Sequence, residues 1–143
     1  MTTATQPAPA GNAEASTKTA RLEHVNITAS DPMRTAQMLC DLFGWHIRWE
    51  GESMGSGRSI HVGTGDQYIA IYNPGKVTAS EESSYVVAGG LNHIALVVDD
   101  LDDAEARVRA AGFTPGSFGD YEPGRRFYFH DLDNIEYEIV SYR

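Results

Sequence analysis

Residues 22–28 read LEHVNIT and residues 91–97 read LNHIALV, and this repeat decides the fold. Polar and apolar side chains alternate along both stretches, as they do in a β-strand whose two faces differ. A histidine, His24 or His93, holds the same position in each copy. The chain is therefore predicted to contain two related halves, each of which begins with a strand that carries a histidine.

A predicted helix follows each of these strands. The first begins at Asp31, a good capping residue that is followed by proline, and it stops at Gly44. The second begins near Asp100 and stops at Gly112. The two starts are separated by the same number of positions as the two histidines, so the halves keep a common register.

Strand-like runs complete both halves and give each the order β-α-β-β-β. The runs cover residues 46–50, 59–63 and 67–72 in the first half and 126–130 and 136–141 in the second, with a weaker candidate at 114–118. Residues 73–90 lie between the halves, contain Pro, Gly, Ser and Glu, and are typical of a linker. The pattern predicts an α+β protein.

The closing stretch of the second half, residues 127–140, reads FYFHDLDNIEYEIV. It resembles a motif of the vicinal oxygen chelate superfamily, which includes glyoxalases, bleomycin resistance proteins and dioxygenases. In that motif FYF is followed by D-P-D-G and then by a glutamate. Leu132 and Asn134 replace the Pro and the Gly, but the segment keeps the polar character of a turn.

The resemblance implies a fold and a division of the chain. The fold is a cup-shaped, glyoxalase-like mixed sheet built from two βαβββ modules. A disordered tail is expected at residues 1–20, followed by a single domain at 21–143 with module 1 at about 21–75, a linker at about 76–90 and module 2 at about 91–143.

The same resemblance implies a metal site in the cup. Family ligands come from the first and last strands of each half, which maps them onto His24, His93 and Glu138. Ala70 holds the fourth position and cannot bind a metal. Two imidazoles and one carboxylate suit one divalent ion, either Fe, Mn, Zn, Ni or Co, and leave coordination positions open for a substrate. Glu138 also lies among apolar residues, where a carboxylate needs a partner or a metal.

Several other polar side chains are expected to line the cup. The substrate-binding candidates are Asn26, Tyr68, Tyr72, Arg126 and Tyr128. The candidates for proton transfer are Tyr128, His61 and His130. Arg126 could hold an anionic group through its planar guanidinium, with an ordinary salt bridge as the alternative. His61 and His130 have surface histidines as their alternative interpretation.

Composition excludes some classes of partner. The chain has 143 residues and a formal net charge of −9, which disfavours binding to nucleic acid or to an anionic membrane. Its single cysteine, Cys40, excludes an intrachain disulfide, so no oxidising compartment is needed. Residues 1–20 lack the apolar stretch of a secretory signal, and no segment approaches the ~20 apolar residues of a membrane span. We expect a cytoplasmic protein.

Two functions from different classes fit these observations. The first is a small metal-dependent enzyme that acts on a substrate with two neighbouring oxygens, by dioxygenase or by glyoxalase-like lyase or isomerase chemistry. The second is a metal-free binding protein of the bleomycin-resistance type that sequesters an aromatic or cationic compound. By family analogy the protein is expected to form a homodimer, and exchanged halves could bring His24 of one chain to His93 and Glu138 of the other.

Overall fold

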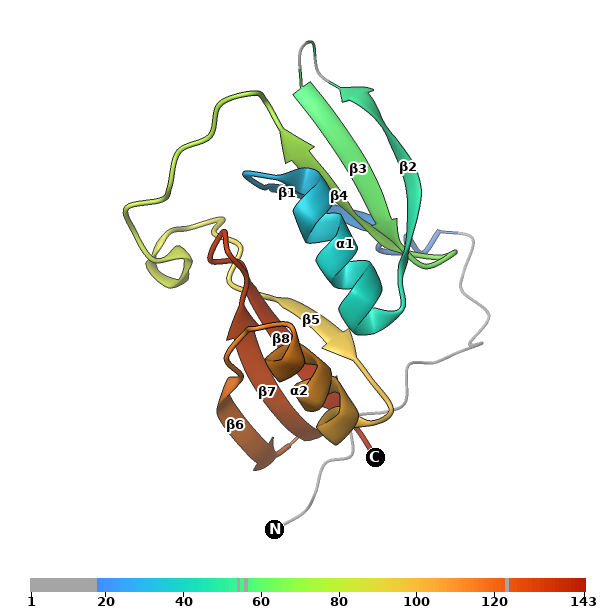
Figure 1. The fold of residues 1–143 in the computed structure, drawn as a ribbon, viewed down its shortest axis with the longest axis vertical. Coiled ribbons are helices and arrows are strands. Elements are labelled where there is room, and N and C mark those ends of the chain that lie inside the picture. The colour runs from blue at the N-terminus through green and yellow to red at the C-terminus, as the bar shows by residue number, and fades with distance from the viewer. Residues whose placement is uncertain (1–17, 54, 56, 123) are drawn as a thin grey trace.

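Two four-stranded mixed sheets, each with one helix, make up the computed structural model of the protein (Figure 1). The structure describes residues 18–53, 55, 57–122 and 124–143. Most of the predicted tail, residues 1–17, lies outside the described residues. The predicted α+β class with two βαβββ modules is confirmed.

The first sheet has the strand order β1-β4-β3-β2, in which β1 runs parallel to β4 and the other pairs are antiparallel. Its elements are β1 (His24–Thr28), α1 (Pro32–Phe43), β2 (His46–Ser53), β3 (Gly57–Gly63) and β4 (Tyr68–Asn73). The parallel pairing of the first and last strands requires a crossover, which α1 supplies.

The second sheet repeats this topology in the order β5-β8-β7-β6, again with its first and last strands parallel. Its elements are β5 (Ile94–Val97), α2 (Leu101–Ala110), β6 (Gly116–Tyr121), β7 (Gly124–His130) and β8 (Glu136–Ser141). One short 3-10 helix, η1 (Ser84–Val86), lies in the linker and was not predicted.

The boundaries of most predicted strands shift in the structure, and β6 and β5 are the clearest cases. The weak candidate at residues 114–118 is β6, which begins and ends later. The pairing of β6 with β7 shifts between Gly116 and Gly119, and Ser117 has a φ of 51°, so the alternation is broken where the strand begins. The strand predicted at 91–97 begins only at Ile94, which leaves His93 immediately before β5.

Both helices begin and end as the sequence predicts. The Asp31 carboxylate accepts a hydrogen bond from the Arg34 amide at 3.2 Å, and Gly44 ends α1 with a φ of 68°. The Asp100 carboxylate accepts from the Asp103 amide at 3.0 Å at the start of α2. These caps fix where each helix begins, and the buried side chains of each helix pack on one face of its own sheet. No helix in the described residues is long and apolar enough to cross a bilayer.

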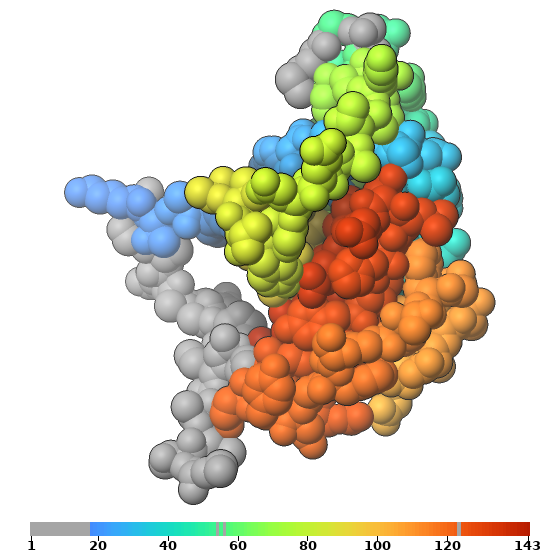
Figure 2. Space-filling view, turned by 90° about the vertical axis from the view of Figure 1, so that its left-hand side faces the viewer, coloured from blue at the N-terminus to red at the C-terminus, as the bar shows by residue number. Residues whose placement is uncertain are grey.

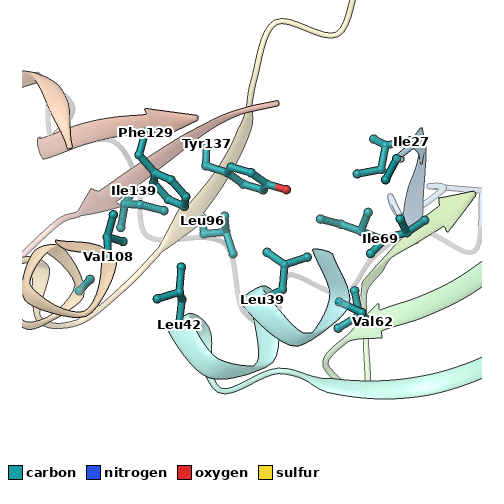
Figure 3. Close-up of a cluster of buried hydrophobic side chains, with 14 of the residues drawn as sticks. Ile27, Leu39, Leu42, Val62, Ile69, Leu96, Val108, Phe129, Tyr137 and Ile139 are labelled. Atoms are coloured by element: carbon teal, nitrogen blue, oxygen red, sulfur yellow. The ribbon is translucent and has the colours of Figure 1, made fainter. Parts of the chain in front are cut away.

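One hydrophobic core joins the two modules (Figure 3). Leu39 and Leu42 of α1 lie between the apolar face of the first sheet, represented by Ile69, and that of the second, represented by Phe129 and Tyr137. The helices therefore occupy the inner face of each sheet. The other face of each sheet carries no helix, and the predicted site residues lie there.

Candidate metal centre

His93 and Glu138 meet on the helix-free face of the second sheet. β8 pairs with β5 so that Glu138 lies opposite Ala95, and this register brings the glutamate beside the residue that precedes β5. His93 Nε2 is 3.0 Å from Glu138 Oε2. Glu138 is only 8% exposed, so its carboxylate has little access to water and needs charged or hydrogen-bonding partners.

Arg126 of β7 supplies the second partner of Glu138. Arg126 Nη1 donates to Glu138 Oε1 at 3.0 Å, and the rest of the guanidinium donates to the carbonyl oxygens of Gly124 and Tyr121. The guanidinium also lies over the Tyr121 ring, 4.9 Å from its centroid. Both oxygens of Glu138 are thus occupied, one by a cation and one by an imidazole.

Tyr85, from η1 in the linker, contacts His93 on its other ring nitrogen. The Tyr85 oxygen is 3.2 Å from His93 Nδ1, and the hydroxyl donates to Glu136 Oε2 at 3.0 Å. Sequence reasoning missed this residue, because a tyrosine in a linker without alternation carries no signal of its own. Glu136 lies on the same face of β8 as Glu138 and was not among the predicted site residues.

The remaining candidates on the second sheet surround this pair. The Tyr128 ring packs edge-on against His93 with a centroid distance of 5.7 Å, and burial, with the Glu138 carboxylate as the next cause, raises the pKa of Tyr128. His130 is half exposed and its Nε2 is 3.8 Å from Glu136 Oε2. Both were predicted to share the face of Arg126, and both contact the acidic residues of that face.

His24 lies on the helix-free face of the first sheet, in a row of rings that crosses all four strands. Its ring stacks on Tyr68 at 4.8 Å, Tyr68 stacks on His61 at 4.5 Å, and Trp49 tilts against His61 at 4.9 Å. Arg48 lies over the Tyr68 ring, 4.5 Å from its centroid. The row combines three predicted site residues with Trp49 and Arg48.

Glu23 anchors one end of this row. Its carboxylate is 2.9 Å from His24 Nδ1 and accepts a hydrogen bond from the Tyr68 hydroxyl at 3.2 Å. The hydrogen bond to His24, followed by that from Tyr68, lowers the pKa of Glu23. Burial lowers the pKa of His61, which favours its neutral, proton-accepting form.

The other predicted residues of the first sheet share this face. The register pairs Asn26 with Ala70 and Thr28 with Tyr72, so both Asn26 and Tyr72 point to the side of His24. Asn26 pairs with Ala70 as Ala95 pairs with Glu138, which places Ala70 at the position equivalent to the glutamate.

The three predicted ligands do not meet within one chain. Among residues 18–53, 55, 57–122 and 124–143, no three His, Cys, Asp or Glu side chains are grouped closely enough to hold a metal. A cavity of ≈320 Å³ lies beside α2, lined by Asp102, Glu105 and Phe118 among others, but it contains none of the three ligands. The donors fit a divalent ion in type, with two on the second sheet and one on the first.

Comparison with known proteins decides the family. Residues 21–139 match the Glyoxalase/Bleomycin resistance protein/Dioxygenase superfamily. The chain belongs to this superfamily. No curated protein matches the chain.

Solved structures of the superfamily fold agree with this assignment. A glyoxylase/bleomycin resistance protein/dioxygenase domain from Frankia sp. EAN1pec is 22% identical, with a TM-score of 0.72 over 87% of this chain and 99% of that one. The fosfomycin resistance protein FosX from Mesorhizobium loti is 26% identical, with a TM-score of 0.61 over 84% and 90%. FosX from Listeria monocytogenes, in complex with Mn(II) and sulfate, is 20% identical, with a TM-score of 0.66 over 86% and 93%.

Proposed function

We propose that this superfamily member is a metal-dependent enzyme whose site combines His24 with His93 and Glu138. The observation that supports it most strongly is the pair formed by His93 Nε2 and Glu138 Oε2, which are 3.0 Å apart on a helix-free sheet face. A nitrogen on a partly buried histidine and an oxygen on a nearly buried carboxylate, held together in this way, are a preformed half of a metal site. The substrate is a small molecule with two neighbouring oxygens.

The third ligand comes from a second copy of the chain. His24 stands at the matching position of the first sheet, yet it contacts Glu23 and Tyr68 rather than the other two ligands. In a homodimer that pairs module 1 of one chain with module 2 of its partner, the two helix-free faces would enclose one cup. Each dimer would then contain two equivalent sites.

Two imidazoles and a carboxylate suit Fe, Mn, Zn, Ni or Co. When bound, such an ion acts as a Lewis acid toward the neighbouring oxygens of the substrate, as dioxygenase or glyoxalase-like lyase or isomerase chemistry requires. The Mn(II) complex of the Listeria FosX shows that this fold accommodates a divalent ion in a relative, and it supports the same proposal here.

The other residues of the two faces have defined roles in this proposal. Arg126 binds Glu138 in the absence of metal, and its guanidinium becomes available to an anionic substrate group once the metal takes the carboxylate. Asn26, Tyr68 and Tyr72 line the opposite wall. Proton transfer falls to His61, His130 or Tyr128, of which His61 is favoured as the base because burial lowers its pKa.

The test is the metal content of the protein purified without chelators or a metal-binding tag. Elemental mass spectrometry is expected to find one divalent ion per chain. Iron would favour oxygen chemistry, whereas zinc, nickel or manganese would favour lyase or isomerase chemistry. Failure to bind any of the five ions after reconstitution would rule out the metal-dependent enzyme.

A second function, metal-free binding of a planar aromatic or cationic compound, has two observations in its favour. The first is that Arg126 neutralises the charge of Glu138 without a metal. The second is that the row of rings from Trp49 to His24 offers a surface for stacking, in which the Trp49 side chain is 47% exposed. This function predicts quenching of Trp49 fluorescence by an aromatic ligand in metal-free protein. A Trp49→Leu variant that keeps wild-type metal binding but loses the ligand would identify the row as its site.

A further inference from the structure

The linker contributes a side chain to the second sheet. η1 holds Tyr85 over the helix-free face, and the linker lies against β8 on the surface seen in Figure 2. The Ser83 hydroxyl accepts a hydrogen bond from the Tyr85 amide at 3.2 Å. Gly90 donates to the Val87 carbonyl at 2.9 Å, and a side chain at Gly90 would collide with the Ser84 backbone. The turn that carries Tyr85 is therefore closely packed.

The direction of the two hydrogen bonds of Tyr85 follows from the chemistry of its partners. A carboxylate only accepts, so the single phenolic proton is donated to Glu136 Oε2, at 3.0 Å. The phenolic oxygen can then accept a proton from His93 Nδ1, 3.2 Å away. His93 Nδ1 is thereby the protonated nitrogen, and the lone pair of a neutral ring lies on Nε2.

His93 Nε2 is the nitrogen that faces Glu138 Oε2. In the absence of a metal, this 3.0 Å contact needs a proton between the two atoms, and a metal ion replaces that proton when it binds. Without Tyr85, nothing accepts a proton from Nδ1, so the single proton of a neutral His93 would lie on Nε2 beside Glu138 and Nδ1 would carry the lone pair. The contact with Tyr85 therefore keeps a proton on Nδ1 and leaves Nε2 as the nitrogen that a metal can take.

We propose that Tyr85 and Glu136 form a positioning pair that holds His93 with Nδ1 protonated and Nε2 directed to the metal. This inference rests on the proposed metal site, and Tyr85 itself touches neither metal nor substrate. Histidine ligands in metal sites commonly donate their second nitrogen to such a partner, which fixes both the tautomer and the orientation of the ring. Here the partner comes from the segment that joins the two modules.

The first test reads the His93 ring directly in metal-free protein. Nitrogen NMR of histidine-labelled protein at about pH 8.5, where an ordinary imidazole is neutral, distinguishes a protonated from an unprotonated ring nitrogen. The wild-type protein is expected to show a protonated Nδ1. The Tyr85→Phe variant is expected to lose the proton from Nδ1 and to keep one on Nε2, while Tyr142→Phe, which alters another exposed tyrosine that is not one of the predicted site residues, keeps the protonated Nδ1. A wild-type tautomer in Tyr85→Phe would overturn the proposal.

The second test measures Zn²⁺ affinity by competition with a chromophoric chelator. Tyr85→Phe is expected to raise the Kd for Zn²⁺ about 10-fold or more, within the ~10–100-fold range typical of partners that orient a metal ligand. Tyr142→Phe should keep the wild-type Kd. Unchanged affinity in Tyr85→Phe would refute the role in metal binding. If the wild-type protein binds no Zn²⁺ but Tyr85→Phe still changes the protonation of His93 Nδ1, the proposed metal site is wrong. The inference that Tyr85 orients His93 is then still supported.

Discussion

Replacing Glu138 with Gln is expected to weaken the binding of a divalent ion by at least about 100-fold, more than the loss of an orienting partner causes. The amide keeps the shape of the carboxylate but removes the charge that a metal requires, and Glu138 is the only carboxylate among the proposed ligands. Isothermal titration with Mn²⁺ and Zn²⁺ measures the change. Because His93 Nε2 lies 3.0 Å from Glu138, His93→Ala should weaken binding to a similar extent.

Glu105→Gln is the matched control for this measurement. Glu105 pairs with Arg109 on the surface of α2 and is not one of the proposed ligands. Its substitution should leave both affinities unchanged. Equal binding by the wild-type protein and Glu138→Gln would show that the ion, if any, is held elsewhere.

Replacing Arg126 with Met is expected to lower the free energy of unfolding of the metal-free protein by about 3 kcal/mol, because it leaves the Glu138 carboxylate buried without a full counter-charge. The side chains of Arg126 and Glu138 are only 10% and 11% exposed. Urea denaturation of metal-free protein measures the loss. A saturating divalent ion should reduce this loss, since the metal replaces the missing positive charge and binds only the folded state.

The neighbouring arginine provides the control. Arg125 pairs with Asp102 at 3.0 Å, but the two side chains are 47% and 81% exposed. Solvent-exposed ion pairs contribute at most about 1 kcal/mol to the free energy of unfolding, so Arg125→Met should change this free energy little. Equal losses in the two variants would mean that the Arg126–Glu138 pair has no special role in the stability of the second sheet.

The fold was predictable because the repeat places the same local signals twice. Strand alternation around His24 and His93, and helix caps at Asp31 and Asp100, each fix a local structure from neighbouring residues alone. The boundaries of β6 were less predictable, because the irregular pairing after Gly116 interrupts the alternation on which strand prediction depends.

The composition of the site was only partly predictable. The repeat singled out His93 and the family resemblance added Glu138, and the structure brings the two together. Two of their partners, Arg126 on Glu138 and Tyr85 on His93, lie 12 and 8 residues away along the chain, and these contacts depend on strand pairing and on the path of the linker. For Arg126 the sequence left two interpretations, an anionic substrate group or an ordinary salt bridge, and the structure shows a salt bridge to Glu138. Tyr85 had no local pattern that could have marked it.

The repeat also does not determine whether the two halves that face each other belong to the same chain or to two chains. The sequence identifies His24 and His93 as equivalent, but either one chain or two could bring them together. The structure places His24 with Glu23, His61 and Tyr68, and the described residues contain no complete three-ligand group. The separation of the two half-sites is what makes a site shared between two chains the central claim.

Mixing two inactive variants tests that claim most directly. Dimers of His24→Ala alone, or of Glu138→Gln alone, lack one ligand at every site and should hold little metal. Co-expression of both variants should give about half mixed dimers, each with one intact site, and so about a quarter of the wild-type metal content. Recovery of that quarter would support sites built from module 1 of one chain and module 2 of the other, whereas no recovery in confirmed mixed dimers would contradict them.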